Sequence, residues 1–374
     1  MNAPVMPPVP SHAIGIYIHI PFCRHKCFYC DFYSLPGREE FVEPYIGAVV
    51  KETVLRSQDT GRLDVASIFF GGGTPSLLAP GQVERIVLAV AAAHNILPGA
   101  EITLEMNPES VTLDKLAGYK ACGVNRVSIG AQSLNPAELQ ALERIHTPRQ
   151  AQEAVEMAIS TGIENVSVDM MFALPGQRVG GFIAQLAEVC RWGIKHLSCY
   201  ELTPEPGTAL GKAVELGEVA LPDNGDEFFD ASERFLGGEG YEHYEISNYA
   251  RPGFECLHNI GYWEYRDYLG IGSGAHGLIG GVRYENARGL EEYLRLAGSG
   301  ALPTVSQEML TPNQKYTERL MLGLRMKEGI QYYDNEITPR LLKLIDQGML
   351  EFSQNRLKTT PGGWRLLNSI LEKV

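Results

Sequence analysis

The sequence predicts an α/β fold: a partial (βα)6 barrel of the TIM type, followed by a small helical, winged-helix-like domain. Short runs rich in β-branched residues alternate with helical stretches about six times, which is typical of a parallel sheet with crossover helices. This alternation alone also fits an open doubly wound sheet. Polar residues or glycines recur where successive strands end, as at the catalytic rim of a barrel, and this favours the barrel. Six units are fewer than eight, so we expect an open side.

Each predicted strand is short and is followed by a predicted helix, as the alternation requires. The strands are expected at residues 14–20, 65–70, 101–106, 126–130, 165–172 and 196–202. The helices of the barrel are expected at residues 41–56, 82–94, 113–122, 136–143, 149–161, 180–192 and 226–236.

Four regions follow from the change of pattern along the chain. Residues 1–13 are expected to be a flexible tail, 14–240 the barrel, 241–305 an aromatic and glycine-rich bridging region, and 306–374 a C-terminal helical module. Within the module, we expect amphipathic helices at 311–327 and 338–347 and a hairpin of 349–352 with 357–359, closed near 361–363.

Composition and charge exclude several classes of protein. The 374 residues carry a formal net charge of −13, which argues against a general binder of nucleic acid or anionic membranes. We find no run of about 18 apolar residues, so no membrane span is expected. The start of the chain lacks the basic and apolar segments of a signal peptide, and the seven cysteines do not form a secreted disulfide pattern. We therefore expect a cytoplasmic protein.

Three of the seven cysteines lie close together, at Cys23, Cys27 and Cys30. Thiolates are soft ligands, and one loop with this spacing can hold three corners of a [4Fe–4S] cluster. One iron would then keep an open position for a small molecule. Zinc held by these cysteines and His25 is an alternative, and a group of buried structural thiols is another.

A glycine-rich turn follows the second predicted strand, in the sequence from Gly71 to Pro75. Glycines at a strand end let the backbone approach a ligand closely, and the exposed amides and carbonyls can bind an amino-acid head group. Taken alone, this segment fits an ordinary tight turn better than a ligand-binding loop. It lacks the dinucleotide-binding pattern G-x-G-x-x-G.

Together, these features resemble the radical S-adenosylmethionine (SAM) superfamily, over about residues 14–210. The patterns Tyr-x-His-Ile-Pro-Phe-Cys and Gly-Gly-Gly-Thr-Pro are similar to those of its oxygen-independent coproporphyrinogen-III oxidase-like branch. The resemblance implies that SAM binds the open iron of a [4Fe–4S] cluster, and that an electron from the cluster cleaves SAM to a radical. In such proteins the cofactor carries the chemistry, and the chain supplies binding and shielding.

The resemblance also implies a role for individual residues of this chain. Cys23, Cys27 and Cys30 are the implied cluster ligands. The implied SAM-binding positions are Tyr17, the backbone at Tyr29, Gly72, Gly73, Thr74, Glu105, Gln132, Arg144 and Asp169. A carboxylate at a strand end, such as Glu105, is a suitable acceptor for the hydroxyls of a ribose. Taken singly, these carboxylates fit a solvated or salt-bridged role as well.

Two features separate this chain from the oxidases of that branch. The oxidases carry a fourth cysteine two residues after the third, where this chain has Phe32. The segment His258-Asn-Ile-Gly-Tyr262-Trp263 resembles the motif of HemW-type haem chaperones. Imidazole is a good axial ligand of haem iron, and Tyr and Trp offer flat surfaces for a porphyrin. A buried histidine with a hydrogen-bond partner is the simpler interpretation of His258 without the resemblance.

The expected function is therefore that of a haem chaperone that binds haem and a SAM-ligated [4Fe–4S] cluster and transfers haem to acceptor proteins. The alternative is a catalytic radical SAM enzyme, either a coproporphyrinogen III dehydrogenase or a related methyltransferase. Phe32 argues against the dehydrogenase, and enzymatic activity stays open. The expected partners are haem-accepting proteins and a reductant for the cluster, without nucleic acid, and a homodimer is left open.

Overall fold

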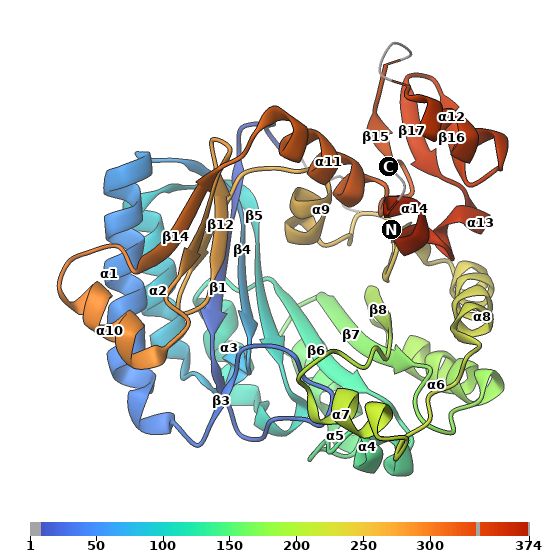
Figure 1. The fold of residues 1–374 in the computed structure, drawn as a ribbon. Helices are drawn as coiled ribbons and strands as arrows, with labels where there is room; N and C mark the ends of the chain where they lie inside the picture. The colour runs from blue at the N-terminus through green and yellow to red at the C-terminus, as the bar shows by residue number, and fades with distance from the viewer. Residues whose placement is uncertain (1–8, 334–336, 373–374) are drawn as a thin grey trace.

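Six parallel strands form the centre of a twelve-stranded sheet in the computed structural model of the chain, which describes residues 9–333 and 337–372. They lie side by side in chain order (Figure 1): β1 (Ile14–Ile20), β4 (Asp64–Gly72), β5 (Asn95–Met106), β6 (Arg126–Gln132), β7 (Asn165–Phe172) and β8 (His196–Glu201). The edge strands of this sheet do not pair with each other within the described residues, so the barrel stays open. The predicted partial barrel is confirmed.

The helices between these strands cover the outer face of the sheet (Figure 1): α1 (Val42–Thr60), α2 (Pro80–Ala93), α3 (Leu113–Ala121), α4 (Pro136–Ala141), α5 (Pro148–Ser160), α6 (Val179–Arg191) and α8 (Gly225–Gly238). Several begin with a capping side chain: the Thr147 hydroxyl accepts from the amide of Gln150, and proline follows at the first helical position. Three 3-10 turns lie at Glu39–Phe41, Pro75–Leu77 and Pro108–Ser110.

The two faces of the central strands differ in chemistry, because successive side chains alternate between them. In β6, Val127 and Ile129 are completely buried in the hydrophobic core, whereas Ser128 donates a hydrogen bond to Asp169 on the neighbouring strand. The outer face thus packs against helices, and the inner face carries polar groups. This is the face on which a binding site can form.

The chain from 241 to 309 adds strands to both edges of the same sheet: β9 (Glu242–Glu245), β10 (Asn248–Ala250), β11 (Tyr268–Ile271), β12 (His276–Ile279), β13 (Val282–Asn286) and β14 (Thr304–Met309), the last of which crosses the boundary predicted at 305. β11 runs parallel to β1 and so covers the edge of the barrel. The helices of this region are α9 (Leu257–Trp263) and α10 (Leu290–Gly298). A Cβ at Gly270 would collide with the carbonyl of His276, so the turn from β11 to β12 depends on glycine.

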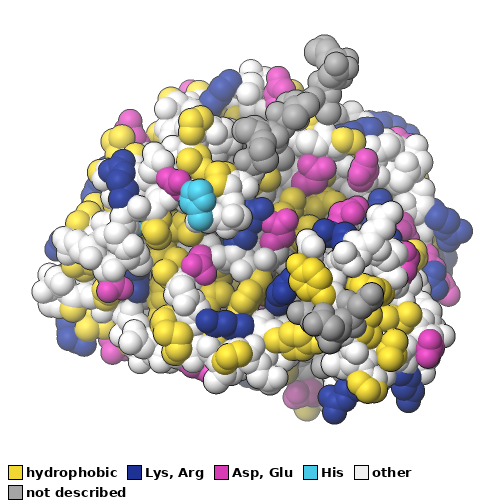
Figure 2. Space-filling view, turned by 90° about the horizontal axis from the view of Figure 1, so that it is seen from above, with side chains coloured by type: hydrophobic (Ala, Val, Ile, Leu, Met, Phe, Trp, Pro, Cys, Tyr) yellow, Lys and Arg dark blue, Asp and Glu magenta, His cyan; other side chains and the backbone are white. Residues whose placement is uncertain are grey.

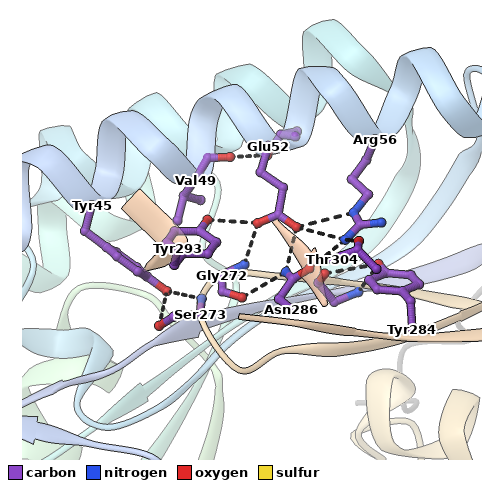
Figure 3. Close-up of polar contacts among 12 residues, drawn as sticks. Tyr45, Val49, Glu52, Arg56, Gly272, Ser273, Tyr284, Asn286, Tyr293 and Thr304 are labelled. Atoms are coloured by element: carbon purple, nitrogen blue, oxygen red, sulfur yellow. Dashed lines mark hydrogen bonds and ion pairs between the residues drawn. The ribbon is translucent and has the colours of Figure 1, made fainter. Parts of the chain in front are cut away.

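A buried polar network ties α1 to these added strands (Figure 3). Glu52 accepts hydrogen bonds from the amide of Gly272, the Tyr293 hydroxyl and the Asn286 amide, at 2.9, 2.8 and 2.7 Å. Its partner one turn later on α1 is Arg56, at 3.3 Å. Both charges are buried, and the hydrogen bonds satisfy the oxygens that burial removes from water.

The C-terminal module has its own hydrophobic core. Its elements are α11 (Pro312–Gly323), β15 (Ile330–Gln331), α12 (Pro339–Asp346), β16 (Leu350–Ser353), β17 (Arg356–Thr359), α13 (Pro361–Trp364) and α14 (Leu367–Leu371). Both predicted helices and both hairpin strands are present. The hairpin turns at Gln354 and Asn355, both with positive φ, and residues 361–364 are helical instead of closing it.

Two sequence predictions concern the N-terminal tail and membrane-spanning helices. Of the predicted tail, residues 1–8 lie outside the described residues, and within it Ala13 is buried while His12 bonds Asp64 at 2.9 Å. No helix in the described ranges combines the length and the apolar character that crossing a membrane requires.

Candidate functional site

The three clustered cysteines lie in one loop that leaves the end of β1. The loop is closed at its base by a two-residue parallel pair, β2 (Phe22–Cys23) with β3 (Leu35–Pro36). Cys23 ends β2, and the amide of Cys30 donates to the carbonyl of Cys27 at 3.1 Å. All three thiols are free. Burial raises the pKa of Cys27 and Cys30, so a bound metal must supply the charge that favours their thiolates.

The thiols open into a cavity of about 590 Å³ at the carboxyl ends of the central strands. Eleven of the predicted cluster and SAM residues line it: Cys23, Cys27, Cys30, Tyr29, Gly72, Gly73, Thr74, Glu105, Gln132, Arg144 and Asp169. These residues come from strands and turns spread over almost 150 positions of the chain. The open barrel therefore brings the predicted SAM positions to the cysteine loop, with the exception of Tyr17.

The donor set fits a cluster better than one zinc ion. A zinc ion needs its ligands to converge on one point, and no three His, Cys, Asp or Glu side chains do so among residues 9–333 and 337–372. His25, the fourth ligand in the zinc interpretation, instead lies 3.5 Å from Glu143. A cubane cluster takes one thiolate on each of three irons, and this loop offers three free thiols.

The glycine-rich turn packs directly against the strand that enters the cysteine loop. The amide of Gly73 donates to the carbonyl of Ile20, and the amide of Thr74 to that of Phe22, both at 2.8 Å. A Cβ at Gly73 would lie 2.5 Å from the Phe22 carbonyl oxygen. Gly72 has a φ of 113°, which strongly favours glycine. The turn therefore sets the position of Cys23, in addition to lining the cavity.

Two carboxylates face the cavity from neighbouring parts of the inner face. Glu105 accepts a hydrogen bond from the amide of Gly72 at 3.2 Å, and Asp169 accepts from Ser128 at 3.0 Å. Burial, followed by the charge of Asp169, raises the pKa of Glu105 to about 7. Burial also raises the pKa of Asp169. Burial disfavours the charged form of both carboxylates. A ligand that donates hydrogen bonds from two hydroxyls, as the ribose of SAM would, would stabilise that charged form.

Arg144 connects the cavity wall to the cysteine loop. Its Nη2 donates to the carbonyl of Gly130 and to Oδ1 of Asn107, at 2.8 and 2.9 Å, and its Nη1 lies 3.5 Å from the Cys27 sulfur. It lies in a turn after α4, where Glu143 has a φ of 54°; α4 ends at Ala141, before the end that the sequence predicts at residue 143. The positive charge lies beside a thiol that must ionise, which suits an anionic cluster.

Other contacts in this region were not predicted. Helix α7 (Ala209–Glu215), absent from the sequence prediction, holds the cysteine loop through the amide of Leu210, which donates to the carbonyl of Phe28 at 3.0 Å. Tyr200 lines the cavity from the end of β8. Tyr17 does not line it: its hydroxyl bonds Nδ1 of His19 at 3.0 Å, and its ring stacks on Phe69. Tyr17 was predicted at the SAM site; of the other contacts, only the end of β8 carried a sequence signal, the polar residue that ends the strand.

The His-Asn-x-x-Tyr-Trp segment forms α9, which lies against the beginnings of β1 and β4, opposite the cysteine loop. His258 is 3% exposed, and its ring nitrogens bond the hydroxyls of Ser67 and Tyr262 at 2.8 and 3.0 Å. The adjoining cavity holds about 10 Å³. In this arrangement His258 is a buried, hydrogen-bonded histidine without space for a porphyrin beside it, and its role toward haem stays a prediction.

The raised pKa of Glu105 predicts a pH effect. The folded state holds this proton to about pH 7, whereas the unfolded chain releases it near 4.5. The free energy of unfolding should therefore fall as the pH rises from about 4.5 to about 7. The expected loss is about 2 kcal/mol after allowing for the exposure of Glu105 to the cavity. Glu105→Gln should flatten this segment, as measured by urea unfolding of cluster-free protein at a series of pH values. An unchanged slope in the variant would contradict the assignment.

Comparison with known proteins places this geometry in a family. The model of the radical SAM superfamily matches residues 17–182, and that of the HemN C-terminal domain matches 310–366. Heme chaperone HemW of Mycobacterium tuberculosis (strain H37Rv) is 32% identical over 100% of this chain and 98% of the relative. Heme chaperone HemW of Escherichia coli is 34% identical over 96% and 97%.

The fold itself matches a solved structure. Coproporphyrinogen III oxidase (HemN) from Escherichia coli superposes with a TM-score of 0.82, at 22% identity, over 97% of this chain and 90% of that one. At this identity the match supports the fold alone. The sequence similarities, which run through the cysteine loop and α9, carry the assignment further: the chain belongs to the radical SAM superfamily and, within it, to the family of the proteins named heme chaperone HemW.

Proposed function

We propose that this chain is a haem chaperone, which binds haem and a SAM-ligated [4Fe–4S] cluster and passes haem to acceptor proteins. Haem is the cargo, and the acceptor proteins and a reductant for the cluster are its partners. All seven cysteines are free thiols, which suits a reducing compartment, and we place the activity in the cytoplasm.

The observation that carries the proposal is the similarity to heme chaperones along almost the whole chain. Helix α9 lies at Leu257–Trp263, between the two matched family models, which end at 182 and begin at 310. Similarity through this region is therefore more than membership of the superfamily requires. It includes the segment in which the sequence predicts haem-binding residues: His258, Tyr262 and Trp263.

The cavity supports the cluster and SAM part of the proposal. Cys23, Cys27 and Cys30 would each bind one iron, and the fourth iron would offer a site for the amino and carboxylate groups of SAM. Glu105 would accept hydrogen bonds from the ribose hydroxyls. The guanidinium of Arg144 keeps its positive charge at neutral pH and would stabilise negative charge on the Cys27 sulfur.

Phe32 supports a chaperone over a coproporphyrinogen dehydrogenase. It occupies the position of the oxidases' fourth cysteine and is 67% exposed. An exposed phenyl ring cannot ligate a metal, so any chemistry that needs that thiol is lost. The similarity of the fold to HemN keeps a catalytic radical SAM enzyme as the second candidate.

One face of the molecule bears on the expectation that nucleic acid is not a partner. On the face drawn in Figure 2, Lys and Arg side chains of the described residues are scattered between acidic and hydrophobic ones and form no continuous basic stripe. Tight nucleic-acid binding needs such a stripe to displace counterions.

Haem titration of the reconstituted protein tests the proposal. The wild type should shift the Soret band with a stoichiometry of one haem per chain, and His258→Ala should lose or alter this shift, because an axial ligand is removed. An absent shift in both proteins would refute haem binding. Anaerobic release of 5′-deoxyadenosine that depends on an added porphyrinogen would favour the enzymatic candidate instead.

A further inference from the structure

Helix α9 carries His258 in a closed state, in which both ring nitrogens are hydrogen-bonded inside the protein. The proposed function, on which this inference rests, requires the same side chain to meet haem. Both nitrogens of the imidazole are engaged, Nδ1 by the Ser67 hydroxyl and Nε2 by the Tyr262 hydroxyl. One nitrogen carries the proton and donates it, and the other accepts with its only lone pair. In either tautomer no lone pair remains for iron.

The surroundings of the ring exclude a porphyrin. Phe69 stacks on the imidazole with a centroid distance of 5.0 Å, and Tyr262 meets it edge-on at 4.8 Å. On the third side, a Cβ at Gly15 would lie 3.1 Å from the ring. A cavity of about 10 Å³ is too small for more than a single water molecule. Haem iron can therefore reach His258 only after the ring leaves this position.

The first turn of α9 is fastened to the inner face of the barrel. The carboxylate of Glu101 accepts from the amides of Leu257 and His258 at 3.1 and 3.2 Å, and the Cys256 thiol lies 3.5 Å from it. Arg126 compensates this buried charge at 3.9 Å. The backbone of α9 is thus fixed at its start, whereas the His258 side chain is held by the two hydroxyls.

We propose that Ser67 is a positioning residue that keeps the haem-binding histidine closed, and that haem binds after His258 breaks this hydrogen bond and turns out of the barrel. Ser67 belongs to strand β4, whereas Tyr262 lies on α9 and can move with the histidine. The apparent haem affinity then equals the affinity of the open state multiplied by its population. Weakening the closed state should tighten haem binding.

The barrel contains a matched control for this contact. Ser167 on β7 bonds Nδ1 of His196 at 2.7 Å, and Nε2 of His196 lies 2.8 Å from the Tyr244 hydroxyl. This Ser–His–Tyr arrangement repeats that of Ser67, with similar lengths and burial. Removing the Ser167 hydroxyl costs the fold a comparable hydrogen bond without touching His258.

The experiment compares haem affinity in Ser67→Ala, Ser167→Ala and the wild type, each reconstituted with its cluster. Ser67→Ala should bind haem about two- to tenfold more tightly, the factor that corresponds to one net hydrogen bond. Ser167→Ala should leave the affinity unchanged, although its melting temperature falls similarly. Adding His258→Ala to Ser67→Ala should abolish the gain. Unchanged or weaker binding by Ser67→Ala would overturn the proposal.

Hydrogen exchange of residues 260–263, which lie beyond the amides that Glu101 holds, supplies a second readout that needs no haem. These amides should exchange faster in Ser67→Ala and not in Ser167→Ala, because Tyr262 moves with the histidine and only the first variant favours opening. If the wild type binds no haem, the proposed function fails while this readout still judges the role of Ser67. Equal exchange in the two variants would show that Ser67 does not keep His258 in its closed position.

Discussion

Replacing Cys27 with alanine should abolish assembly of the cluster, from about four irons per chain in the reconstituted wild type to the background of the assay. Three thiols line the cavity, and with one removed the chain offers thiolates to only two irons. Arg144, which lies 3.5 Å from the Cys27 sulfur, would also lose the negative charge it faces. Iron and sulfide analysis, with the visible absorbance of the cluster, measures the outcome.

Cys122→Ala and Cys190→Ala are the matched controls for this result. Both cysteines are free and partly buried on outer helices or their ends, away from the cavity. Each variant should keep the iron content of the wild type, because neither thiol reaches the loop. A full cluster in Cys27→Ala would show that the ligand assignment is wrong.

Glu52→Ala should lower the free energy of unfolding by about 3–5 kcal/mol, the cost of leaving a buried charge without its partner. Arg56 has 4% of its side chain exposed and could not recover the lost interaction from water. Four groups that now donate to the Glu52 carboxylate would lose their acceptor: the Gly272 amide, the Tyr293 hydroxyl, the Asn286 amide and Arg56 (Figure 3). Urea unfolding monitored by circular dichroism measures the loss.

Glu153→Ala provides the control, because Glu153 pairs with Arg149 four residues away on the surface of α5. An exposed pair of this kind contributes little, so the loss should stay below about 0.5 kcal/mol. A double variant, Glu52→Leu with Arg56→Met, should recover part of the Glu52→Ala loss, since it removes both charges. Equal losses in Glu52→Ala and Glu153→Ala would mean that the buried network does not stabilise the fold.

The sequence predicted the central strands well because their signal is local. Runs such as β1, with four isoleucines, are recognisable without their partners, and turn residues mark their ends. The cavity was predictable for the same reason: parallel strands place their carboxyl ends together, so Gly72, Glu105, Gln132 and Asp169 had to meet. The family resemblance then supplied their expected roles at a SAM site.

The elements that were missed depend on distant partners. β11 is only four residues long and contains Gly270, and its strand character comes from pairing with β1. Arg144 points into the cavity because of a turn at Glu143 that no periodicity signals. The state of His258 is set by Ser67, which lies 191 residues earlier in the chain. Side-chain contacts over such separations leave no pattern that a window of sequence can reveal.

The pairing of β1 with β11 also has a consequence for the order of events during synthesis. β1 and the cysteine loop emerge early, yet β1 keeps one uncovered edge until β11 is made. The Tyr45 hydroxyl, which donates to the His19 carbonyl just before the loop, takes its other hydrogen bond from the amide of Ser273, 228 residues away. Because chains emerge from the N-terminus, the loop reaches its final setting only when most of the protein exists, and we expect delivery of the proposed cluster's iron to follow translation.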